Sequence, residues 1–344
     1  MDLSDTINAY LRDRAARGVS KSTIYGDKQA LQYLLADVGN ISTARLRPQH
    51  LDMFWQNRTN WAPGTCNRAQ SILSMYFKWC QNRGYLSRSA NLLEDRKPLR
   101  VPPRKRLIIP QSDFSTFLEG DYKDPRTRPV LAIGLYLFLR RSEITMLRWQ
   151  DWNEQMGTIE VFREKTKTLD TLPVCTELEH ELKRWRLEYA GLVGTIPAPS
   201  NYIIPARNRP SFTGVGQRKL EMVDYGDFYP NTRARVDVLI KHALLKAGYF
   251  QPQEGGHTLR RSGAVALYNQ LTSVGHDRAI RVCQAMLGHS KIATTEVYLR
   301  LDLDRKVRND LLAGQPMFPD RGEGVVLELG DVKHGEGDAR SVPL

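Results

Sequence analysis

Apolar residues recur at helical spacing through the first 95 residues of the chain. Ile7, Tyr10 and Leu11 form one such stripe behind Ser4 or Asp5, either of which can cap a helix. The same spacing predicts two further helices, with these apolar residues: Leu31, Leu34 and Leu35 after a start at Thr23, then Leu51, Phe54 and Trp55. Residues 1–95 are therefore predicted to form an all-helical unit.

A fourth helix of this unit has the clearest pattern. It is predicted to begin at Thr65, directly after the Pro63-Gly64 break, and to end at Gly84. Its apolar face carries Ile72, Leu73, Tyr76, Phe77 and Cys80.

A second domain, over residues 107–312, mixes two periodicities. Helical patterns cover Ser112–Leu118 and Pro129–Trp149, and two strand-like runs, 157–163 and 171–174, flank a turn at 165–170. Beyond these the pattern predicts a helix at Glu177–Tyr189, a loop region over about 193–230, and helices from Thr232 onward. The fold class expected is mainly α, with an α+β second domain that holds a small antiparallel sheet.

Two segments differ in composition from these domains. Residues 96–106, RKPLRVPPRKR, hold six positive charges, no negative charge and three prolines. They form a linker that is either a solvated tether or a basic strap along a DNA backbone, and the charge favours the strap. Residues 313–344 hold six acidic and three basic residues, and are either a disordered end or a tail that docks through its apolar Val325–Leu329 run.

Composition narrows the class of protein. The chain has 344 residues, of which 41% are hydrophobic, and a net charge of +12, which suggests two domains and a polyanionic partner such as nucleic acid. The four cysteines form no CxxC pair, which argues against a zinc site and a disulfide framework. The chain lacks a signal region and an apolar run of about 18 residues. A cytoplasmic protein without a membrane span is expected.

The segment His257-Thr-Leu-Arg260-Arg261 could carry chemistry. Offsets of three and four residues put these side chains on one helix face. A guanidinium can hold two phosphate oxygens, and a neighbouring histidine can move a proton near neutral pH. Taken alone, the segment favours a surface helix with a solvated charge pair.

A second segment, Leu287-Gly288-His289, precedes Tyr298 by nine residues. Gly288 should end a helix, which places His289 in a turn and Tyr298 on the helical turn begun by Thr294 or Thr295. A tyrosine on an apolar helix is usually part of the core. It becomes a nucleophile only where cations and a base lower the cost of losing its proton.

Arg140 follows a long apolar run and needs a partner if it is buried. Glu143, three residues later, could supply a purely structural ion pair. Lys165 and Lys167 occupy the predicted hairpin tip, where lysines are common but where one could also protonate a leaving oxygen.

In this order the motifs resemble the tyrosine recombinase (phage integrase) family over about residues 4–310. The first box of the family appears as Leu139-Arg140-Arg141-Ser142-Glu143 followed by Leu147-Arg-Trp149-Gln-Asp151. The hairpin lysine corresponds to Lys165, eight residues before Pro173. The second box appears as His257 to Arg260, and Leu-Gly-His as Leu287 to His289, with the tyrosine at Tyr298.

This resemblance implies a helical core-binding (SAM-like) domain and a catalytic domain that clamp double-stranded DNA as a homotetramer on two recombination sites. Tyr298 would attack a phosphorus and form a 3′-phosphotyrosine. Arg140 and Arg260 would hold the phosphate oxygens, Lys165 would protonate the leaving 5′ oxygen and His257 would be the general acid/base. His289 would hydrogen-bond the phosphate, with Glu143 supporting the site. The resemblance implies neither metal nor cofactor.

Candidate DNA contacts are the basic residues of the linker and one residue of the helical unit: Lys97, Arg100, Arg104, Lys105, Arg106 and Arg68. An accessory DNA-bending or directionality protein is a further expected partner, and the protein is expected to associate with the nucleoid of a bacterial host.

Three questions stay open at this point. Arg141 adjoins Arg140, Lys167 competes with Lys165, and residues 137–138 replace the Thr-Gly that often precedes the first arginine of the family. An integrase of a phage or other mobile element is favoured over a chromosome-dimer resolvase. The rival functions are a type IB topoisomerase and a DNA-binding protein on the same scaffold that lacks catalysis.

Overall fold

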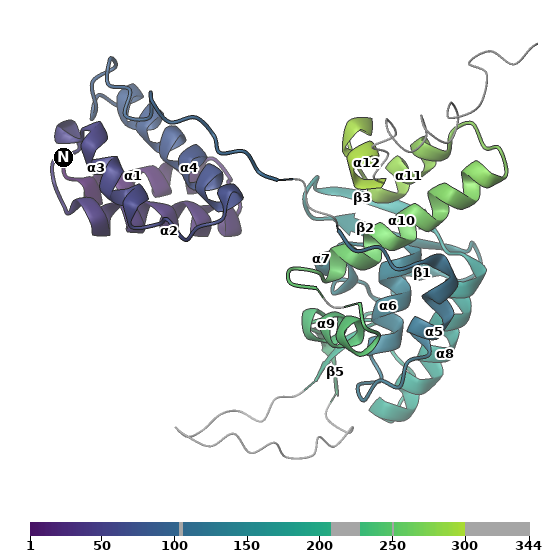
Figure 1. The fold of residues 1–344 in the computed structure, drawn as a ribbon. Coiled ribbons are helices and arrows are strands. Elements are labelled where there is room, and N and C mark those ends of the chain that lie inside the picture. The colour runs from purple at the N-terminus through teal and green to yellow at the C-terminus, as the bar shows by residue number, and fades with distance from the viewer. Residues whose placement is uncertain (103–105, 208–227, 250, 300–344) are drawn as a thin grey trace, which may run out of the picture. The chain divides into compact units, whose positions relative to one another are not determined.

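The computed structural model of the chain describes residues 1–102, 106–207, 228–249 and 251–299. The chain divides into two compact units, Met1–Lys105 and Arg106–Leu344 (Figure 1). The acidic tail and the strap residues Arg104 and Lys105 lie outside the described residues. No helix in the described part of the chain is long and apolar enough to cross a membrane.

The first unit is helical. Its elements are α1 (Leu3–Ala16), α2 (Lys21–Val38), the 3-10 helix η1 (Thr43–Arg45), α3 (Pro48–Gln56) and α4 (Pro63–Asn82). The predicted apolar stripes face one another and form a core of their own. Inside this core, the Thr6 hydroxyl lies 2.8 Å from Thr43 Oγ1 and 2.6 Å from Tyr76 Oη. The hydroxyl groups of these three buried side chains therefore all have a hydrogen-bond partner.

Three predicted helix starts in this unit were wrong. α1 begins at Leu3, so neither Ser4 nor Asp5 is its cap. The Leu3 and Ser4 amides instead donate to the Ile41 carbonyl and the Asn40 side chain, each at 2.9 Å.

The other two starts were each wrong by two residues. α4 begins at Pro63 rather than Thr65, because proline fits the first helical position, where no amide hydrogen bond is lost. α2 begins at Lys21 rather than Thr23, because Ser20 is the cap and its hydroxyl accepts from the Thr23 amide at 3.2 Å.

The first part of the linker is bound to α4. The Asn67 side chain pairs with both the amide and the carbonyl of Leu99, each at 2.8 Å, and Gln70 Nε2 donates to the Arg96 carbonyl at 2.6 Å. The Arg96 guanidinium lies 3.7 Å from the ring centre of Trp55. Residues 96–99 therefore belong to the first unit instead of forming a free tether.

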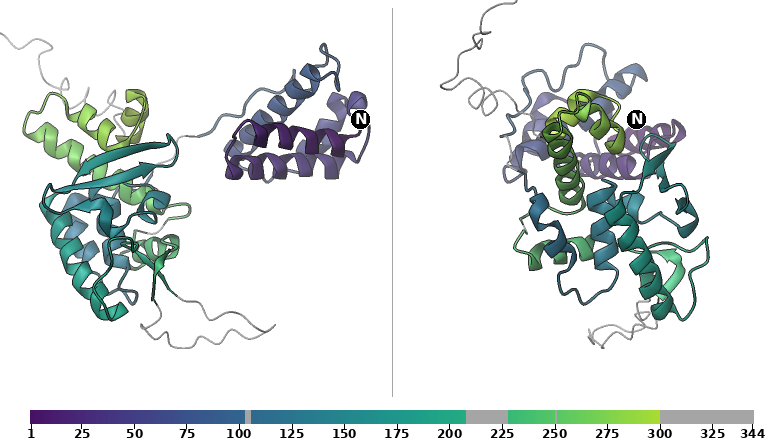
Figure 2. Two further views of the ribbon diagram at one scale, coloured as in Figure 1. Left: turned by 180° about the vertical axis from the view of Figure 1, so that it is seen from behind. Right: turned by 90° about the vertical axis from the view of Figure 1, so that its right-hand side faces the viewer.

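The second unit holds a three-stranded antiparallel sheet in the order β1-β2-β3 (Trp152–Asn153, Thr158–Arg163, Thr168–Pro173). In both Figure 1 and Figure 2 the sheet lies between α11 and α12 on one side and α8 on the other. The remaining elements of this unit are η2 (Gln111–Asp113), α5 (Phe114–Leu118), α6 (Thr127–Tyr136), α7 (Arg141–Ile144), η3 (Trp149–Asp151), α8 (Thr176–Val193), β4 (Pro205–Arg207), β5 (Phe228–Arg233), α9 (Asp237–Lys246), α10 (Gly256–Ser273), α11 (Ala279–Leu287) and α12 (Ile292–Leu299).

The helix predicted over Pro129–Trp149 is interrupted in the structure. α6 ends at Tyr136, Phe138 takes a left-handed backbone conformation with φ of 52°, and α7 starts only at Arg141. Such a conformation is unfavourable for a bulky residue and persists only where the surroundings hold it. The buried Phe138 ring and a hydrogen bond to the Phe138 carbonyl supply that hold.

The loop predicted over 193–230 contains one short strand, β4, and the start of a second, β5, which continues to Arg233. β4 and β5 pair antiparallel and form a second small sheet, so the prediction of helices from Thr232 onward was also wrong. Helix resumes at Asp237. Residues 208–227, which the structure does not describe, separate β4 from β5 in the sequence. Strands that pair across 20 intervening residues produce no periodic pattern within a short stretch of sequence, so the sheet could not be predicted.

Close packing between α6 and α10 sets the position of the helix that carries Arg260. A Cβ placed on Gly263 would lie 1.8 Å from the Leu135 carbonyl oxygen and 2.5 Å from the Phe138 ring. A Cβ on Gly134 would lie 2.7 Å from Leu259. The two helices can approach this closely only because glycine occupies both contact points.

We expect Gly263→Ala to lower the free energy of unfolding of the full chain by about 3 kcal/mol or more, because the added methyl meets backbone that cannot yield. Chemical denaturation measures this. Gly191→Ala is the matched control: Gly191 lies in α8 with no atom near its Cβ position, so alanine should be neutral or stabilising by up to about 1 kcal/mol. Equal stability of the two variants would contradict the packing argument.

Candidate active site

Arg140 lies at the N-terminal end of α7, directly after the backbone turn at Phe138. Glu143 accepts the Arg140 amide and the Arg140 Nη1 hydrogen, each at 2.7 Å. The Glu143 side chain is 1% exposed, whereas that of Arg140 is 24% exposed. The ion pair predicted from sequence exists, and solvent reaches its arginine.

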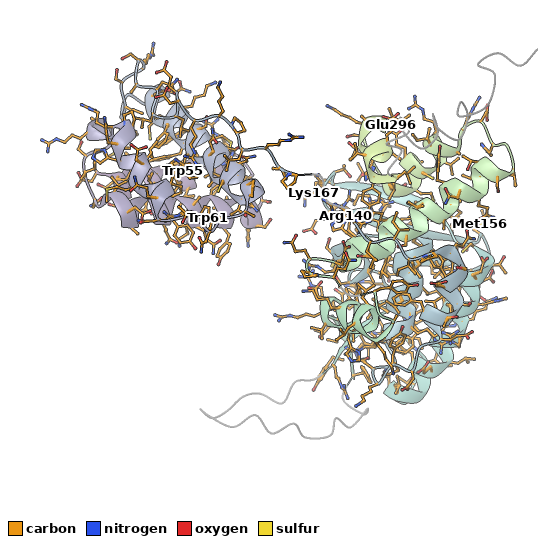
Figure 3. All side chains as sticks on the ribbon, viewed as in Figure 1. Trp55, Trp61, Arg140, Met156, Lys167 and Glu296 are labelled. Atoms are coloured by element: carbon orange, nitrogen blue, oxygen red, sulfur yellow. The ribbon has the colours of Figure 1, made fainter. Side chains whose placement is uncertain are left out.

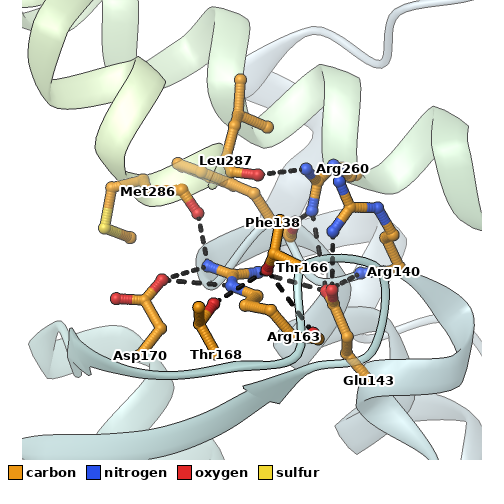
Figure 4. A network of polar contacts seen from close by, with 10 residues as sticks. All are labelled: Phe138, Arg140, Glu143, Arg163, Thr166, Thr168, Asp170, Arg260, Met286 and Leu287. Atoms are coloured by element: carbon orange, nitrogen blue, oxygen red, sulfur yellow. Dashed lines mark hydrogen bonds and ion pairs between the residues drawn. The ribbon is translucent and has the colours of Figure 1, made fainter. Parts of the chain in front are cut away.

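Glu143 is shared by two further guanidinium groups (Figure 4). Its carboxylate lies 3.1 Å from Arg163 and 3.8 Å from Arg260. Burial alone would raise the pKa of Glu143, but hydrogen bonds from Arg140 and the charge of Arg163 hold it below its usual value. The carboxylate is therefore ionised near neutral pH and orients three cations at once.

Arg260 is buried on α10 and bridges two helix ends. Its Nη1 donates to the Phe138 carbonyl after α6, and its Nη2 donates to the Leu287 carbonyl at the end of α11. Burial lowers the pKa of Arg260 to about 10, so the group still carries its charge at neutral pH. The break in the predicted helix thus provides one of the two carbonyl oxygens that hold this arginine.

The turn after α11 is formed as predicted from the sequence, with Gly288 ending the helix. Gly288 has φ of 58° and ends the helix in the left-handed conformation, and His289 follows it. His289 Nδ1 lies 3.1 Å from Thr295 Oγ1 of α12. Burial, followed by the charges of Arg260 and Arg140, lowers the pKa of His289 to about 4. This imidazole is neutral at physiological pH.

Tyr298 lies on α12, next to His289 and the Arg260 guanidinium. Its ring centre is 5.5 Å from that of His289 in an edge-on arrangement and 6.0 Å from the Arg260 guanidinium carbon. Its hydroxyl donates to the His257 carbonyl at 3.3 Å. Burial raises the pKa of Tyr298, although the charges of Arg260 and Arg261 act in the opposite direction. The phenol therefore keeps its proton at neutral pH.

His257 is in the first turn of α10, beside the Tyr298 hydroxyl. Desolvation by the surrounding protein lowers its pKa, and the charges of Arg260 and Arg140 lower it further. Arg106, the last residue of the basic linker, contributes to the same effect. A neutral imidazole can accept a proton, which suits a general base.

The two lysines of the hairpin have different surroundings. Lys165 is exposed, and it lies close enough to His289 for its charge to contribute to the lowered pKa of that imidazole. The Lys167 ammonium lies 6.0 Å from the ring centre of Phe162, which is exposed. In Figure 3 the hairpin tip at Lys167 lies near Arg140, while Met156, before the start of β2, lies at the far end of the strand.

Two arginines noted in the sequence point away from the cluster. Arg141 is exposed and pairs with Asp237 at 2.7 Å. Arg261 is buried, donates to the Leu107 carbonyl at 3.0 Å and pairs with Glu254 at 2.8 Å. Arg261 therefore joins the start of the second unit to α10. Because Arg261 is buried and paired, Arg260 and Arg261 are not the solvated charge pair of a surface helix that the sequence alone allowed.

Sequence reasoning missed Arg163, which is buried in the cluster. The signal for it was available: Ile159 and Val161 face the core in β2, and strand alternation puts Arg163 on the same face. A charged residue at an inward strand position needs partners from elsewhere in the fold.

The described candidate DNA contacts are exposed. These are Arg68 on α4, Lys97 and Arg100 in the linker, and Arg106 at its end. Within the described part of the chain, no group of three or more histidine, cysteine or acidic residues could hold a metal ion.

Residues 112–305 match the model of the phage integrase family. The chain is 26% identical to tyrosine recombinase XerC of Xanthomonas axonopodis pv. citri (strain 306), over 86% of each protein. It is also 26% identical to tyrosine recombinase XerD of Pseudomonas aeruginosa, over 72% of this chain and 74% of that protein. The resemblance inferred from the motifs is confirmed.

Solved structures share the fold. A lambda integrase dimer bound to a COC′ core site matches with a TM-score of 0.61 at 15% identity, over 87% of this chain and 95% of that one. The Tn1549 transposon integrase in complex with transposon right end DNA matches with a TM-score of 0.62 at 15% identity, over 87% and 94%. The predicted helix-rich fold with small antiparallel sheets is confirmed.

The depressed pKa of His289 predicts a pH dependence of stability. The unfolded chain binds a proton at this residue below about pH 6.5, whereas the folded chain does so only near pH 4. The free energy of unfolding should therefore fall as the pH falls through this window. We expect the stability difference between wild type and His289→Gln to shrink between about pH 7 and about pH 5 in chemical denaturation.

His180→Gln, which changes an exposed histidine of α8, is the control and should follow the wild-type curve at a constant offset. A constant offset for His289→Gln as well would contradict the depressed pKa.

Proposed function

Because the chain belongs to the phage integrase family and is a tyrosine-type site-specific recombinase, we propose that Tyr298 is the nucleophile with which it breaks and rejoins DNA. One observation carries the proposal: the Tyr298 ring lies over the Arg260 guanidinium and beside His289, with its hydroxyl at the start of α10. A phosphate that enters this cluster meets the phenol and the cations together.

The reaction is a transesterification. The Tyr298 oxygen forms a bond to phosphorus, the bond to the 5′ oxygen breaks, and a 3′-phosphotyrosine remains. Attack by the 5′ hydroxyl of another strand reverses these steps and rejoins DNA. The bond energy is kept in the phosphotyrosine, and the exchange is divided into two easier steps.

Each neighbouring group has a proposed role. Arg140 and Arg260 bind the non-bridging oxygens and stabilise the charge that develops on them in the transition state. His257 takes the phenol proton; its lowered pKa leaves the imidazole unprotonated at neutral pH and so free to accept one. Lys165 gives a proton to the leaving 5′ oxygen. His289 hydrogen-bonds the phosphate, and Glu143 holds Arg140 in place.

The substrate proposed is double-stranded DNA at two recombination sites, held by a homotetramer. The net charge of +12 supports a polyanionic partner. A neighbouring fold, the lambda integrase, has been solved as a tetramer bound to a Holliday junction. Arg68, Lys97, Arg100 and Arg106 are the described candidates for phosphate contacts, with Arg104 and Lys105 beside them in sequence.

We also propose that the enzyme serves a phage or other mobile element, with an accessory DNA-bending or directionality protein. The long segment between β4 and β5 and the acidic residues of 313–344 support this origin. The position of the target site tests it, because an element-borne recombinase acts next to its own gene, whereas a chromosomal one acts elsewhere.

Tyr298→Phe should abolish covalent attachment to DNA, because phenylalanine has no nucleophilic oxygen. Wild-type protein is incubated with sheared DNA of its source organism, and adducts that resist SDS are captured and sequenced. The recovered site is then made as a nicked duplex that traps the adduct. Tyr268→Phe is the matched control, since Tyr268 is half-buried in the same apolar cluster outside the cation site, and it should form the adduct normally.

An adduct with Tyr298→Phe would reassign the nucleophile. Tight binding without any adduct from the wild type would favour the DNA-binding protein without catalysis. Relaxation of supercoiled DNA at scattered sites, without joining of two sites, would favour the type IB topoisomerase.

Lys165→Ala should slow cleavage of the nicked duplex by about 10²–10⁴-fold, the usual contribution of a general acid. Lys167→Ala should slow it by less than about 10-fold, because the Lys167 ammonium lies against Phe162. Single-turnover cleavage rates decide between them. A larger effect at Lys167 would make that residue the acid.

A further inference from the structure

Arg163 is the last residue of β2 and points into the protein. Its side chain is 3% exposed, although it is charged. Burial of a guanidinium is costly unless its donors are matched by acceptors. The hydrogen-bond acceptors around the Arg163 guanidinium therefore indicate the role of this residue.

Three acceptors from separate parts of the fold surround the guanidinium (Figure 4). Nη1 donates to Glu143 Oε2 at 3.1 Å, Nε donates to Asp170 Oδ2 at 3.1 Å, and Nη2 donates to the Met286 carbonyl at 2.9 Å. One side chain thus joins the carboxylate that holds Arg140, the strand β3 and the end of α11.

The backbone of Arg163 also fixes the hairpin tip. Its carbonyl accepts the amides of Thr166 and Lys167, at 3.2 and 2.8 Å. Arg163 pairs with Thr168 at the last rung of the β2–β3 ladder, so the loop that carries Lys165 begins and closes on this residue.

The turn that carries His289 packs directly on the same side chain. A Cβ on Gly288 would lie 3.3 Å from Arg163 Nε. Gly288 therefore serves two purposes: it permits the left-handed backbone, and it lets the turn approach the arginine.

A lysine could not replace this arrangement. The three acceptors lie in different directions around a planar group with five donors, whereas an ammonium is a single point charge on a flexible stem. The geometry of the acceptors matches a guanidinium.

We propose that Arg163 is a positioning residue that locks the hairpin loop bearing Lys165 against the turn bearing His289. Both groups then face the same phosphate, and Lys165 is held in reach of the leaving 5′ oxygen. The inference rests on the proposed function, because it assigns Arg163 a task in leaving-group protonation. Arg163 itself does not contact the DNA.

The test compares two forms of the nicked duplex, one with oxygen and one with sulfur at the bridging 5′ position of the scissile phosphate. A thiolate leaves without being protonated, so the sulfur substrate does not need the acid. We expect Arg163→Met to slow cleavage of the oxygen substrate by about 100-fold and to cleave the sulfur substrate within about 5-fold of the wild type. Lys165→Ala should give the same pattern.

Arg126→Met is the matched control. Arg126 is also buried, pairs with a carboxylate, Asp124 at 2.7 Å, and donates to a backbone carbonyl, that of Pro205 at 2.9 Å. It lies outside the cluster, so its loss should reduce stability and leave the ratio of the two cleavage rates at the wild-type value.

Asp170→Ala is a second variant that avoids a fully buried change. The Asp170 side chain is 34% exposed, and its removal frees one side of Arg163 without deleting the guanidinium. We expect slower cleavage of the oxygen substrate, by about 10-fold, and recovery with sulfur. This variant keeps the test open if Arg163→Met fails to fold.

Equal slowing of both substrates by folded Arg163→Met or by Asp170→Ala would overturn the inference, because the defect would then lie outside leaving-group protonation. A wild type that cleaves neither substrate would instead reject the proposed function. The two failures are therefore distinguishable.

Discussion

One buried carboxylate, Glu143, is shared by three guanidinium groups, and the geometry of the cluster follows from that constraint. Arg140, Arg163 and Arg260 all approach it, while backbone carbonyls at the ends of α6 and α11 take up further donors of Arg260 and Arg163. Asp170 adds a second carboxylate beside Arg163, but the carbonyls carry only partial negative charge, so the three guanidinium groups still leave an excess of positive charge. A site that is positive before DNA arrives is suited to an anion whose charge increases during reaction.

That excess charge explains the protonation states around it. The cations add to desolvation by the surrounding protein in lowering the pKa values of the exposed His257 and the half-buried His289, so both imidazoles are neutral in the free protein. The same cations act against burial at Tyr298, but burial prevails and its phenol stays protonated. In the free protein the phenol is therefore protonated, and both imidazoles are able to accept a proton.

Local patterns predicted those parts of the site that local chain geometry determines. The pairing of Arg140 with Glu143 follows from a spacing of three residues, and the turn at Gly288 follows from its position after an apolar helix. The break at Phe138 and the burial of Arg163 could not be read in the same way. Both depend on contacts with α10 and α11, more than 120 residues away in sequence. The strands β4 and β5 were missed for a similar reason.

The two interpretations of Arg140, a structural ion pair and a phosphate ligand, are compatible. Arg140 gives Nη1 to Glu143, yet a guanidinium has five N–H donors. The exposures of the three arginines on Glu143 separate their tasks: 24% for the Arg140 side chain, 3% for Arg163 and 1% for Arg260. The Arg163 guanidinium is enclosed by Glu143, Asp170 and the Met286 carbonyl, and the Tyr298 ring lies over Arg260. On the proposed mechanism, a phosphate from solvent would meet Arg140 first and would reach Arg260 beside the Tyr298 ring.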